Sequence, residues 1–474
     1  MKNKLKKERA KGDEKHTRKN YPALFPVFMN IPAFRLIPMK RAVLFLSVVF
    51  LLNACYKDDI DDLNKKYDDL RTEQERQEEE LNQYKTLLNA MEQKLTVSSI
   101  ETTGDGTRIW FSDGSCVDAG NSAAIVSVEE LNGQVFFHMS DGSVITIQKK
   151  ESIALYILSE GGMGQGNSDL SYYDIRTQML STKYFSGQNT TPLGDTGNDL
   201  KLYGSKMYCV VSGPAMSAGG HIEVIDPKTG LSVKRILATD ADGNPDMPRR
   251  IALADGKVYV TMYSGSVARI DTTTLEINGR VPLSGSYPEG ICTYGGKLYV
   301  CNSGQGPGNT ISVIDLSGFT ETGTIKVPEN PSMIEATPKG DIYFTTADYS
   351  WANGDVSKLH RFNVSDIENI KTFDIRASKL VIGQEYVYVV ETDWTTYGTY
   401  FSKVNLKTDE VGDFISDGTS IMLGYNICMD PTNGDIYVSQ SMGDWIYCYD
   451  SAGKKKIILK TKVVNGSAIA FITR

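Results

Sequence analysis

The segment Pro288-Glu-Gly-Ile-Cys-Thr-Tyr-Gly-Gly-Lys-Leu-Tyr-Val-Cys301, followed by Ile314-Asp-Leu-Ser-Gly318, decides the fold of this 474-residue chain. It reads as one strand, a Gly-Lys turn, a second strand centred on Tyr299, and a third strand that ends in Asp315 before another turn. Units of this kind recur at a period of about 45 residues, which indicates a repeat architecture. The tyrosine anchors of the units are Tyr156, Tyr208, Tyr259, Tyr299, Tyr343, Tyr388 and Tyr437, and the Asp or Asn anchors are Asp174, Asp226, Asp271, Asp315, Asn363, Asn405 and Asp450.

Seven anchor pairs without a helical period predict an all-β fold, a seven-bladed β-propeller over residues 151–474. The first unit begins at its second strand, Ile153–Leu158, and the chain ends with a spare strand pattern, Ser467–Thr473. We therefore expect the C-terminal strand to complete blade one and to remove an exposed sheet edge.

Residues 55–97 predict an α-helical coiled-coil stalk, because apolar residues alternate at steps of three and four from Ile60 to Leu95. The seam is polar only at Gln74 and Gln77, and no Gly or Pro interrupts Tyr56–Val97. A homotrimer would bury this seam, and the alternative is a single helix that lies along the head. Residues 98–150 predict a small β-hairpin module, because two Ser-Asp-Gly turns, at Asp113 and Asp141, lie between β-rich segments.

The segment Met39–Cys55 has the pattern of a lipoprotein signal peptide: Lys40 and Arg41, an apolar run, then Ala54 before Cys55. We interpret residues 1–38 as a mis-assigned N-terminal extension, residues 39–54 as the signal peptide and Cys55 as the lipidation site. A transmembrane anchor is the alternative, although the apolar run is short for one. Residues 1–54 carry 12 Lys or Arg and 3 Asp or Glu, so their removal leaves 38 basic and 55 acidic residues, a formal charge of −17. This charge argues against nucleic acid as a partner.

The residues after Cys55, Tyr-Lys-Asp-Asp59, resemble the sorting signal of surface-exposed outer-membrane lipoproteins. The repeats over residues 152–474 resemble the YncE-like seven-bladed propellers, and the stalk with its Ser-Asp-Gly hairpins resembles an N-terminal domain of unknown function found on surface lipoproteins. Similar lipoproteins include cobalamin-capturing accessories of TonB-dependent transporters. The resemblance thus implies a lipid-anchored protein at the cell surface that is not an enzyme, with a transporter as partner and a corrinoid as the first ligand to test.

A ligand of a propeller is expected at the channel mouth, where loops from all repeats converge. Alignment of the inner strands on Glu289 places seven residues at one position: Asn198, Arg249, Glu289, Ser332, Ser378, Asn426 and Ser467. Their neighbours Asp199, Arg250, Lys379 and Tyr425 complete the predicted ligand-binding set. Aromatic residues on loops form a second predicted set, suited to a cofactor, a sugar or a protein: Tyr263, Tyr349, Trp351, Trp394, Tyr397 and Trp445.

The head offers little catalytic chemistry, since His221 and His360 are its only histidines and no Gly-x-Ser-x-Gly motif occurs. We predict no catalytic residue and no cofactor, with calcium as the one exception to consider. The alternating oxygens of Asp240, Asp242, Asn244 and Asp246 resemble a calcium loop, but Pro245 stands where the loop needs Gly. Two alternatives stay open: a calcium-dependent lactonase or lyase that uses Glu289, Asn426 and Asp199, and an adhesin that binds glycan or protein.

Overall fold

The computed structural model describes residues 57–474 except 94, 104–105, 120–123, 132–133, 348–356 and 395. The predicted signal peptide, Cys55, Tyr349 and Trp351 lie outside the described residues. Contacts within the chain separate it into two units between Gln74 and Glu75, and each unit is described by itself. Among the helices that the structure describes, none combines the length and apolar character needed to cross a membrane.

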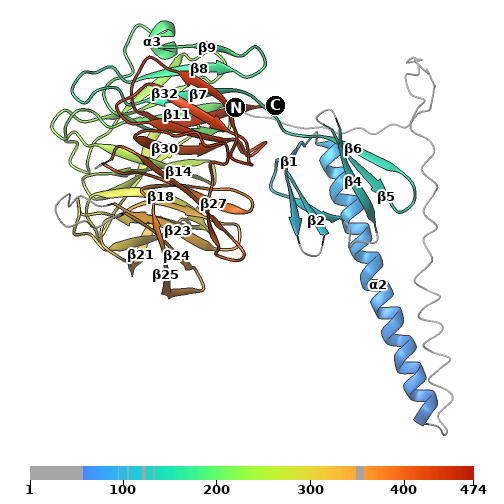
Figure 1. The fold of residues 1–474 in the computed structure, drawn as a ribbon. Coiled ribbons are helices and arrows are strands. Elements are labelled where there is room, and N and C mark those ends of the chain that lie inside the picture. The colour runs from blue at the N-terminus through green and yellow to red at the C-terminus, as the bar shows by residue number, and fades with distance from the viewer. Residues whose placement is uncertain are drawn as a thin grey trace, which may run out of the picture. The chain divides into compact units, whose positions relative to one another are not determined.

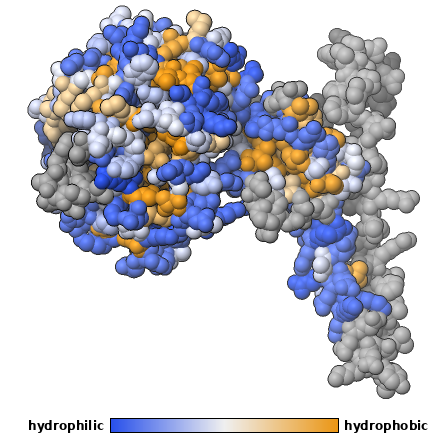
Figure 2. All heavy atoms as spheres, in the orientation of Figure 1, coloured by the Kyte–Doolittle hydropathy of each residue, from blue (hydrophilic) through white to orange (hydrophobic). Residues whose placement is uncertain are grey.

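Helix α2 (Lys57–Glu92) confirms the helical prediction, and Figure 2 shows a mostly hydrophilic surface along it. Its heptad seam is exposed in the single chain, with Leu63 at 43%, Tyr67 at 57% and Leu70 at 70% of full exposure. The last turns differ from an isolated stalk, because Leu87 and Ala90 are completely buried in the core of the following β-module. The helix therefore ends as part of that module.

The β-module contains two three-stranded antiparallel sheets, and both predicted Ser-Asp-Gly hairpins form. In each turn Gly adopts a positive φ, 86° at Gly114 and 82° at Gly142. The Asp side chains accept backbone N–H bonds from Ser115 and Ser143 at 2.9 and 2.8 Å. The strands are β1 (Val97–Thr103), β2 (Gly106–Phe111), β3 (Cys116–Ala119), β4 (Ile125–Leu131), β5 (Gln134–Met139) and β6 (Val144–Gln148).

The head has a propeller-like fold of four-stranded antiparallel sheets, seven among the described residues (Figure 1). Six sheets follow chain order: β10 (Gly197–Tyr203), β11 (Lys206–Val211), β12 (His221–Ile225), β13 (Ser232–Leu237); β14 (Pro248–Ala254), β15 (Lys257–Met262), β16 (Ser266–Asp271), β17 (Glu276–Pro282); β18 (Pro288–Tyr294), β19 (Lys297–Asn302), β20 (Thr310–Asp315), β21 (Thr320–Lys326); β22 (Pro331–Ala336), β23 (Asp341–Thr346), β24 (Lys358–Asn363), β25 (Asp366–Arg376); β26 (Lys379–Ile382), β27 (Tyr386–Thr392), β28 (Thr399–Asn405), β29 (Val411–Asp413); and β30 (Gly424–Met429), β31 (Ile436–Gln440), β32 (Trp445–Tyr449), β33 (Lys455–Lys460).

The remaining sheet joins the two ends of the head. Its order is β34-β7-β8-β9, from β34 (Gly466–Thr473), β7 (Ser152–Ser159), β8 (Asp169–Asp174) and β9 (Met179–Ser181). Strand β34 pairs antiparallel with β7, with Ile469 opposite Ile157. The short helix α3 (Tyr184–Gln188) follows β9. The C-terminal strand therefore lies in the same sheet as the first strand of the head.

The first strands of the sheets contact one another in cyclic order: β10, β14, β18, β22, β26, β30, β34 and back to β10. Most of them begin with a register irregularity, as between Pro288 and Ile291 or between Gly424 and Ile427. A bulge re-aims the side chains beside it, so several consecutive side chains are directed away from the regular alternation at this end of the strands. The predicted site residues lie at these bulges.

A hydroxyl on the second strand links three of the sheets to their neighbours. Thr261 accepts the backbone N–H of Arg250 in its own sheet and donates to the Glu289 carbonyl of the next sheet, at 3.0 and 2.9 Å. Thr345 and Ser439 occupy the corresponding positions and make the same pair of bonds. These hydroxyls satisfy the backbone groups that the bulges leave outside the ladder.

Candidate functional site at the channel mouth

Strand register corrects one position in the predicted ring. Ile291 of β18 and Ile427 of β30 lie opposite equivalent residues of their second strands, Val300 and Val438. Tyr425 therefore corresponds to Glu289, and Asn426 corresponds to the next residue along the strand. The sequence alignment assigned Asn426 to the Glu289 position because it placed this segment one residue out of register.

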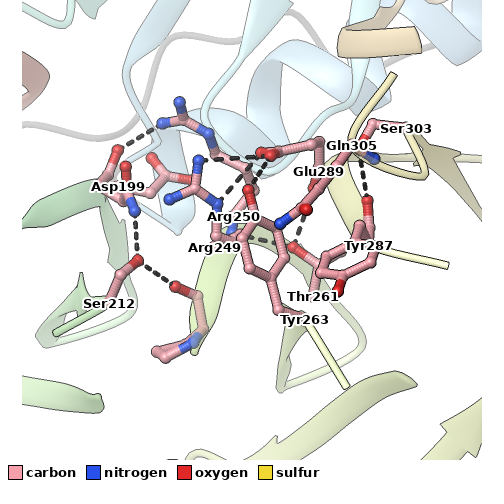
Figure 3. Close-up of polar contacts among 12 residues, drawn as sticks. Asp199, Ser212, Arg249, Arg250, Thr261, Tyr263, Tyr287, Glu289, Ser303 and Gln305 are labelled. Carbon is pink, nitrogen blue, oxygen red and sulfur yellow. Dashed lines mark hydrogen bonds and ion pairs between the residues drawn. The ribbon is translucent and has the colours of Figure 1, made fainter. Parts of the chain in front are cut away.

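Four residues at the mouth form a tightly connected group, which we name the Glu289 cluster: Arg249, Tyr263, Tyr287 and Glu289 (Figure 3). The Arg249 guanidinium donates to the Glu289 carboxylate, with Nε to Oε2 at 3.2 Å, and lies 4.7 Å above the Tyr263 ring. The Tyr263 hydroxyl donates to the same carboxylate, and its ring meets Tyr287 edge-on at 5.5 Å. Burial disfavours the charged carboxylate, but the Arg249 charge and the Tyr263 bond outweigh it and lower the pKa of Glu289.

Asp199 and Arg250 connect β10 with β14. The Asp199 carboxylate accepts the backbone N–H groups of Leu200 and Ile251, each at 2.8 Å. Arg250 donates through Nη1 to the Asn198 carbonyl, and its Nε has no hydrogen-bond partner among the described residues. The Asn198 amide in turn donates to Ser212. Both oxygens of Asp199 are thus used by the fold, whereas Arg250 retains unused donors.

Lys379, at the start of β26, lies among charges from several elements. Burial, and then the positive charges of Arg250 and Arg249, lower the pKa of Lys379 to about 8, and Glu289 and Glu160 oppose this shift. Glu160, which follows β7, accepts a hydrogen bond from the Tyr425 hydroxyl at 2.7 Å. No hydrogen bond or ion pair of the Lys379 ammonium occurs within the described part of the chain.

A cavity of about 520 Å³ extends from this mouth between the first strands. Asp199, Arg250 and Asn426 line it together with apolar side chains such as Ile251 and Ile427. Two further charges line its wall: Lys201, whose pKa the neighbouring Asp199 raises, and Glu335, whose pKa burial raises. Glu335 accepts the Ile382 N–H at 2.9 Å.

The small polar residues of the predicted ring serve the backbone. Ser378 donates to the Val390 carbonyl at 3.0 Å, Asn426 donates to the Ser467 carbonyl, and Ser467 donates to the Gly197 carbonyl at 2.6 Å. Ser332 is half-buried near the start of β22. The Asn426 and Ser467 contacts tie adjacent sheets together at the mouth, whereas the Ser378 contact lies within one sheet.

The described members of the predicted loop aromatics lie in different surroundings. Tyr263 belongs to the Glu289 cluster, whereas Trp394, Tyr397 and Trp445 are exposed at 41%, 53% and 38%. Trp445 begins β32 and has the Lys460 ammonium 4.9 Å from its ring centroid. Tyr349 and Trp351 lie outside the described residues. A shared aromatic platform therefore stays a prediction.

Two carboxylates of the predicted calcium loop, those of Asp240 and Asp246, are occupied by turn contacts. Asp240 accepts the backbone N–H groups of Asp242 and Asn244, and the buried Asp246 accepts from Met247 and Ser264. Within the described residues, no group of three or more His, Cys, Asp or Glu side chains is placed to hold a metal ion. The motif therefore acts as a pair of turn caps.

Sequence reasoning missed Glu160, Lys201 and Glu335. Lys201 follows Asp199 by two residues on the same strand, so the period of two could have found it. Glu335 follows Ser332 by three residues, across a register shift that breaks this period. Glu160 comes from the loop after β7, and no strand pattern indicates it.

Three solved structures illustrate what the chain is similar to. Hydrazine synthase of Kuenenia stuttgartiensis is 15% identical, with 54% of this chain and 76% of that chain covered and a TM-score of 0.46. Two proteins, each described as a "putative 6-phosphogluconolactonase", come from Bacteroides uniformis and Bacteroides fragilis. They are 12% and 13% identical, with 68% of this chain and 99% and 98% of those chains covered, both at a TM-score of 0.49. At TM-scores below 0.5 these likenesses assign neither an activity nor a ligand.

No curated protein matches the chain. A family model described as Domain of unknown function (DUF5074) matches residues 154–463, which is nearly the whole head.

Proposed function

The chain belongs to the family described as Domain of unknown function (DUF5074), and we propose that it is a binding protein that captures a polar small molecule at the channel mouth. The observation that carries this proposal is the unequal use of charge there. The carboxylates of Glu289, Asp199 and Glu160 accept hydrogen bonds from the protein, while the Lys379 ammonium has no such partner in the described chain. Arg250, whose Nε also has no partner among the described residues, lines the cavity, and an unsatisfied cation at an open cavity suits a ligand.

The same contacts favour binding over metal-dependent catalysis. Glu289 and Asp199 were the carboxylates of the calcium-dependent alternative, but Arg249 and Tyr263 hold the first and two backbone N–H groups hold the second. A metal would have to displace these donors, which would leave a buried arginine unpaired.

We further propose that the seven sheets are the blades of a closed ring, with β34 as its last strand. The cyclic contacts of the first strands and the β34–β7 pairing support this. Deletion of residues 466–474 is expected to lower the melting temperature strongly, because it leaves β7 an unpaired edge. An unchanged melting temperature would contradict ring closure.

The place and partners of the protein are also proposals, supported by the sequence before residue 57. We propose that Cys55 carries a lipid anchor in the outer membrane, that the head faces the cell surface, and that it delivers its ligand to a TonB-dependent transporter. Intact-mass analysis of the purified protein tests the anchor, and Cys55→Ala should release the protein from the membrane. A full-length precursor that keeps residues 1–54 would overturn the anchor.

Gentle solubilisation of outer membranes followed by affinity capture and mass spectrometry tests the uptake role. A stoichiometric TonB-dependent transporter supports it, and recovery of the protein alone counts against it. Calorimetry with corrinoids tests the first named ligand, and absence of micromolar binding removes corrinoid while leaving other ligands.

We propose that α2 associates as a homotrimer through its exposed seam, which includes Leu63, Tyr67 and Leu70. Light scattering of the full chain gives the mass. Leu70→Glu should dissociate the oligomer, whereas a monomeric wild-type chain would contradict the proposal.

A further inference from the structure

We infer that the channel mouth is an oxyanion subsite, in which Lys379 and Arg250 bind a carboxylate or phosphate group of the ligand. This inference rests on the proposed binding function and names the chemistry of the group that is held. Its basis is the distribution of hydrogen bonds around the cavity, and it needs no group beyond those already described.

The mouth and cavity wall carry four cations, Lys201, Arg249, Arg250 and Lys379, and four carboxylates, Glu160, Asp199, Glu289 and Glu335. The formal charges cancel, but the carboxylates and the cations differ in how many of them have a hydrogen-bond partner in the protein. Each carboxylate accepts from a protein donor.

The cations are less completely satisfied. Arg249 is held by Glu289, but Arg250 has only a neutral carbonyl as its side-chain partner. No side-chain partner of Lys379 or Lys201 occurs among the described residues. The donors left over are therefore positive, and their natural partner is an oxyanion.

The charges around Lys379 explain why its unpaired ammonium indicates a bound anion. Four charged groups from three elements act on it electrostatically: Arg249 and Arg250 of β14, Glu289 of β18 and Glu160 of the loop after β7. Two like charges and burial destabilise the ammonium, as its lowered pKa reflects. An apolar side chain would avoid this penalty, whereas a bound oxyanion would offset it.

Pyridoxal 5′-phosphate is a direct probe of this subsite. The neutral Lys379 amine adds to its aldehyde carbon, water leaves to give an imine, and added borohydride delivers hydride to yield a stable secondary amine. Pyridoxal, which has the same aldehyde without the phosphate, is the matched control. Peptide mapping by mass spectrometry then measures labelling at each lysine.

At pH 7.5 we expect Lys379 to be labelled about tenfold more by pyridoxal 5′-phosphate than by pyridoxal, because a charge-assisted bond from Arg250 holds the phosphate while the Lys379 amine reacts. Excess inorganic phosphate or acetate should protect it, and their relative protection distinguishes a phosphate from a carboxylate ligand. Equal labelling by both aldehydes would overturn the subsite, as would labelling of exposed Lys228 that equals labelling of Lys379.

Thermal denaturation provides a second readout that needs no covalent step. Phosphate or acetate should raise the melting temperature of the wild type and of Lys379→Arg, which keeps the charge. Lys379→Met should lose the effect, and the exposed variant Lys228→Met should keep it. Retention of the effect in Lys379→Met would overturn the inference. A positive result here without a co-purifying transporter would separate the subsite from the uptake role.

Discussion

The two sides of the channel mouth use similar residues in opposite ways. In the Glu289 cluster, guanidinium, carboxylate and phenol satisfy one another. Arg250, the residue after Arg249, and Lys379 at the start of β26 retain donors that the fold does not use. The comparison teaches that charged residues at one mouth can have a structural role or a ligand-binding role, and that hydrogen-bond satisfaction distinguishes the two.

The largest loss of stability is expected when a member of the Glu289 cluster is replaced. Glu289→Gln leaves Arg249 buried without a counter-charge, so the free energy of unfolding should fall by about 3–5 kcal/mol. Urea denaturation followed by tryptophan fluorescence measures it. Glu276→Gln is the control, because its ion pair with Lys234 is exposed and should change stability by less than about 1 kcal/mol. Equal effects of the two variants would remove the structural role of the cluster.

His360, elsewhere in the head, is another buried residue whose polar atoms are paired within the protein, and it predicts a pH dependence of stability. His360 is buried between Thr346 and Thr372 and stacks on Phe344, and burial, with a smaller contribution from Lys358, lowers its pKa to about 4. The unfolded chain, with a pKa near 6.5, binds the proton first as the pH falls. The stabilisation is therefore complete above about pH 6.5 and lost progressively towards pH 4, by about 3 kcal/mol in total.

Urea denaturation of the wild type and His360→Gln between pH 7 and pH 4 tests this dependence. The variant should show a smaller loss, and His138→Gln, at an exposed position in the β-module, should match the wild type. A wild-type curve that His360→Gln does not flatten would show that other groups cause the acid sensitivity.

Removal of the Thr261 hydroxyl, which joins two neighbouring sheets, should cause an intermediate loss of stability. Thr261→Val removes the acceptor for the Arg250 N–H and the donor to the Glu289 carbonyl, which should cost about 1–3 kcal/mol of stability. Thr345→Val should behave similarly, because it occupies the corresponding position. The exposed Thr273→Val serves as the control, and a link without structural value would leave all three variants alike.

The smallest effect on stability is expected on the unsatisfied side. Lys379→Met removes a charge that no protein group pairs, so the free energy of unfolding should equal that of the wild type or exceed it by about 1 kcal/mol. Thermal and urea denaturation measure this. A loss of several kcal/mol would place Lys379 with the structural residues and remove the contrast between the two sides.

The sequence predicted the architecture well, because alternation, Asp-Gly turns and tyrosine anchors are local signals. The hairpins at Asp113 and Asp141 form, and the spare C-terminal strand pairs as expected. For the site, the sequence predicted where the residues lie but not which of them contact one another. Alignment brought Arg249 and Glu289 together, but it misplaced Asn426 by one residue, because it did not match Ile427 with Ile291. The sequence could not predict which polar side chains bond to one another, because the contact of Tyr263 with Glu289 and that of Tyr425 with Glu160 depend on loop geometry.

The sheet that joins both ends of the head has a consequence for biogenesis. Ser467 and Leu158, which meet in this sheet, are 309 residues apart in the chain. The ribosome makes the N-terminal partner first, so β7 pairs only with β8 until residues 466–473 of β34 have been made. During that interval β7 has an unpaired edge that is prone to aggregation, and a holdase chaperone that binds it would protect it. Folding of this sheet should also be slow, because its partners are far apart in the chain. The synthesis of β34 thus sets the earliest time at which this sheet of the head can be completed.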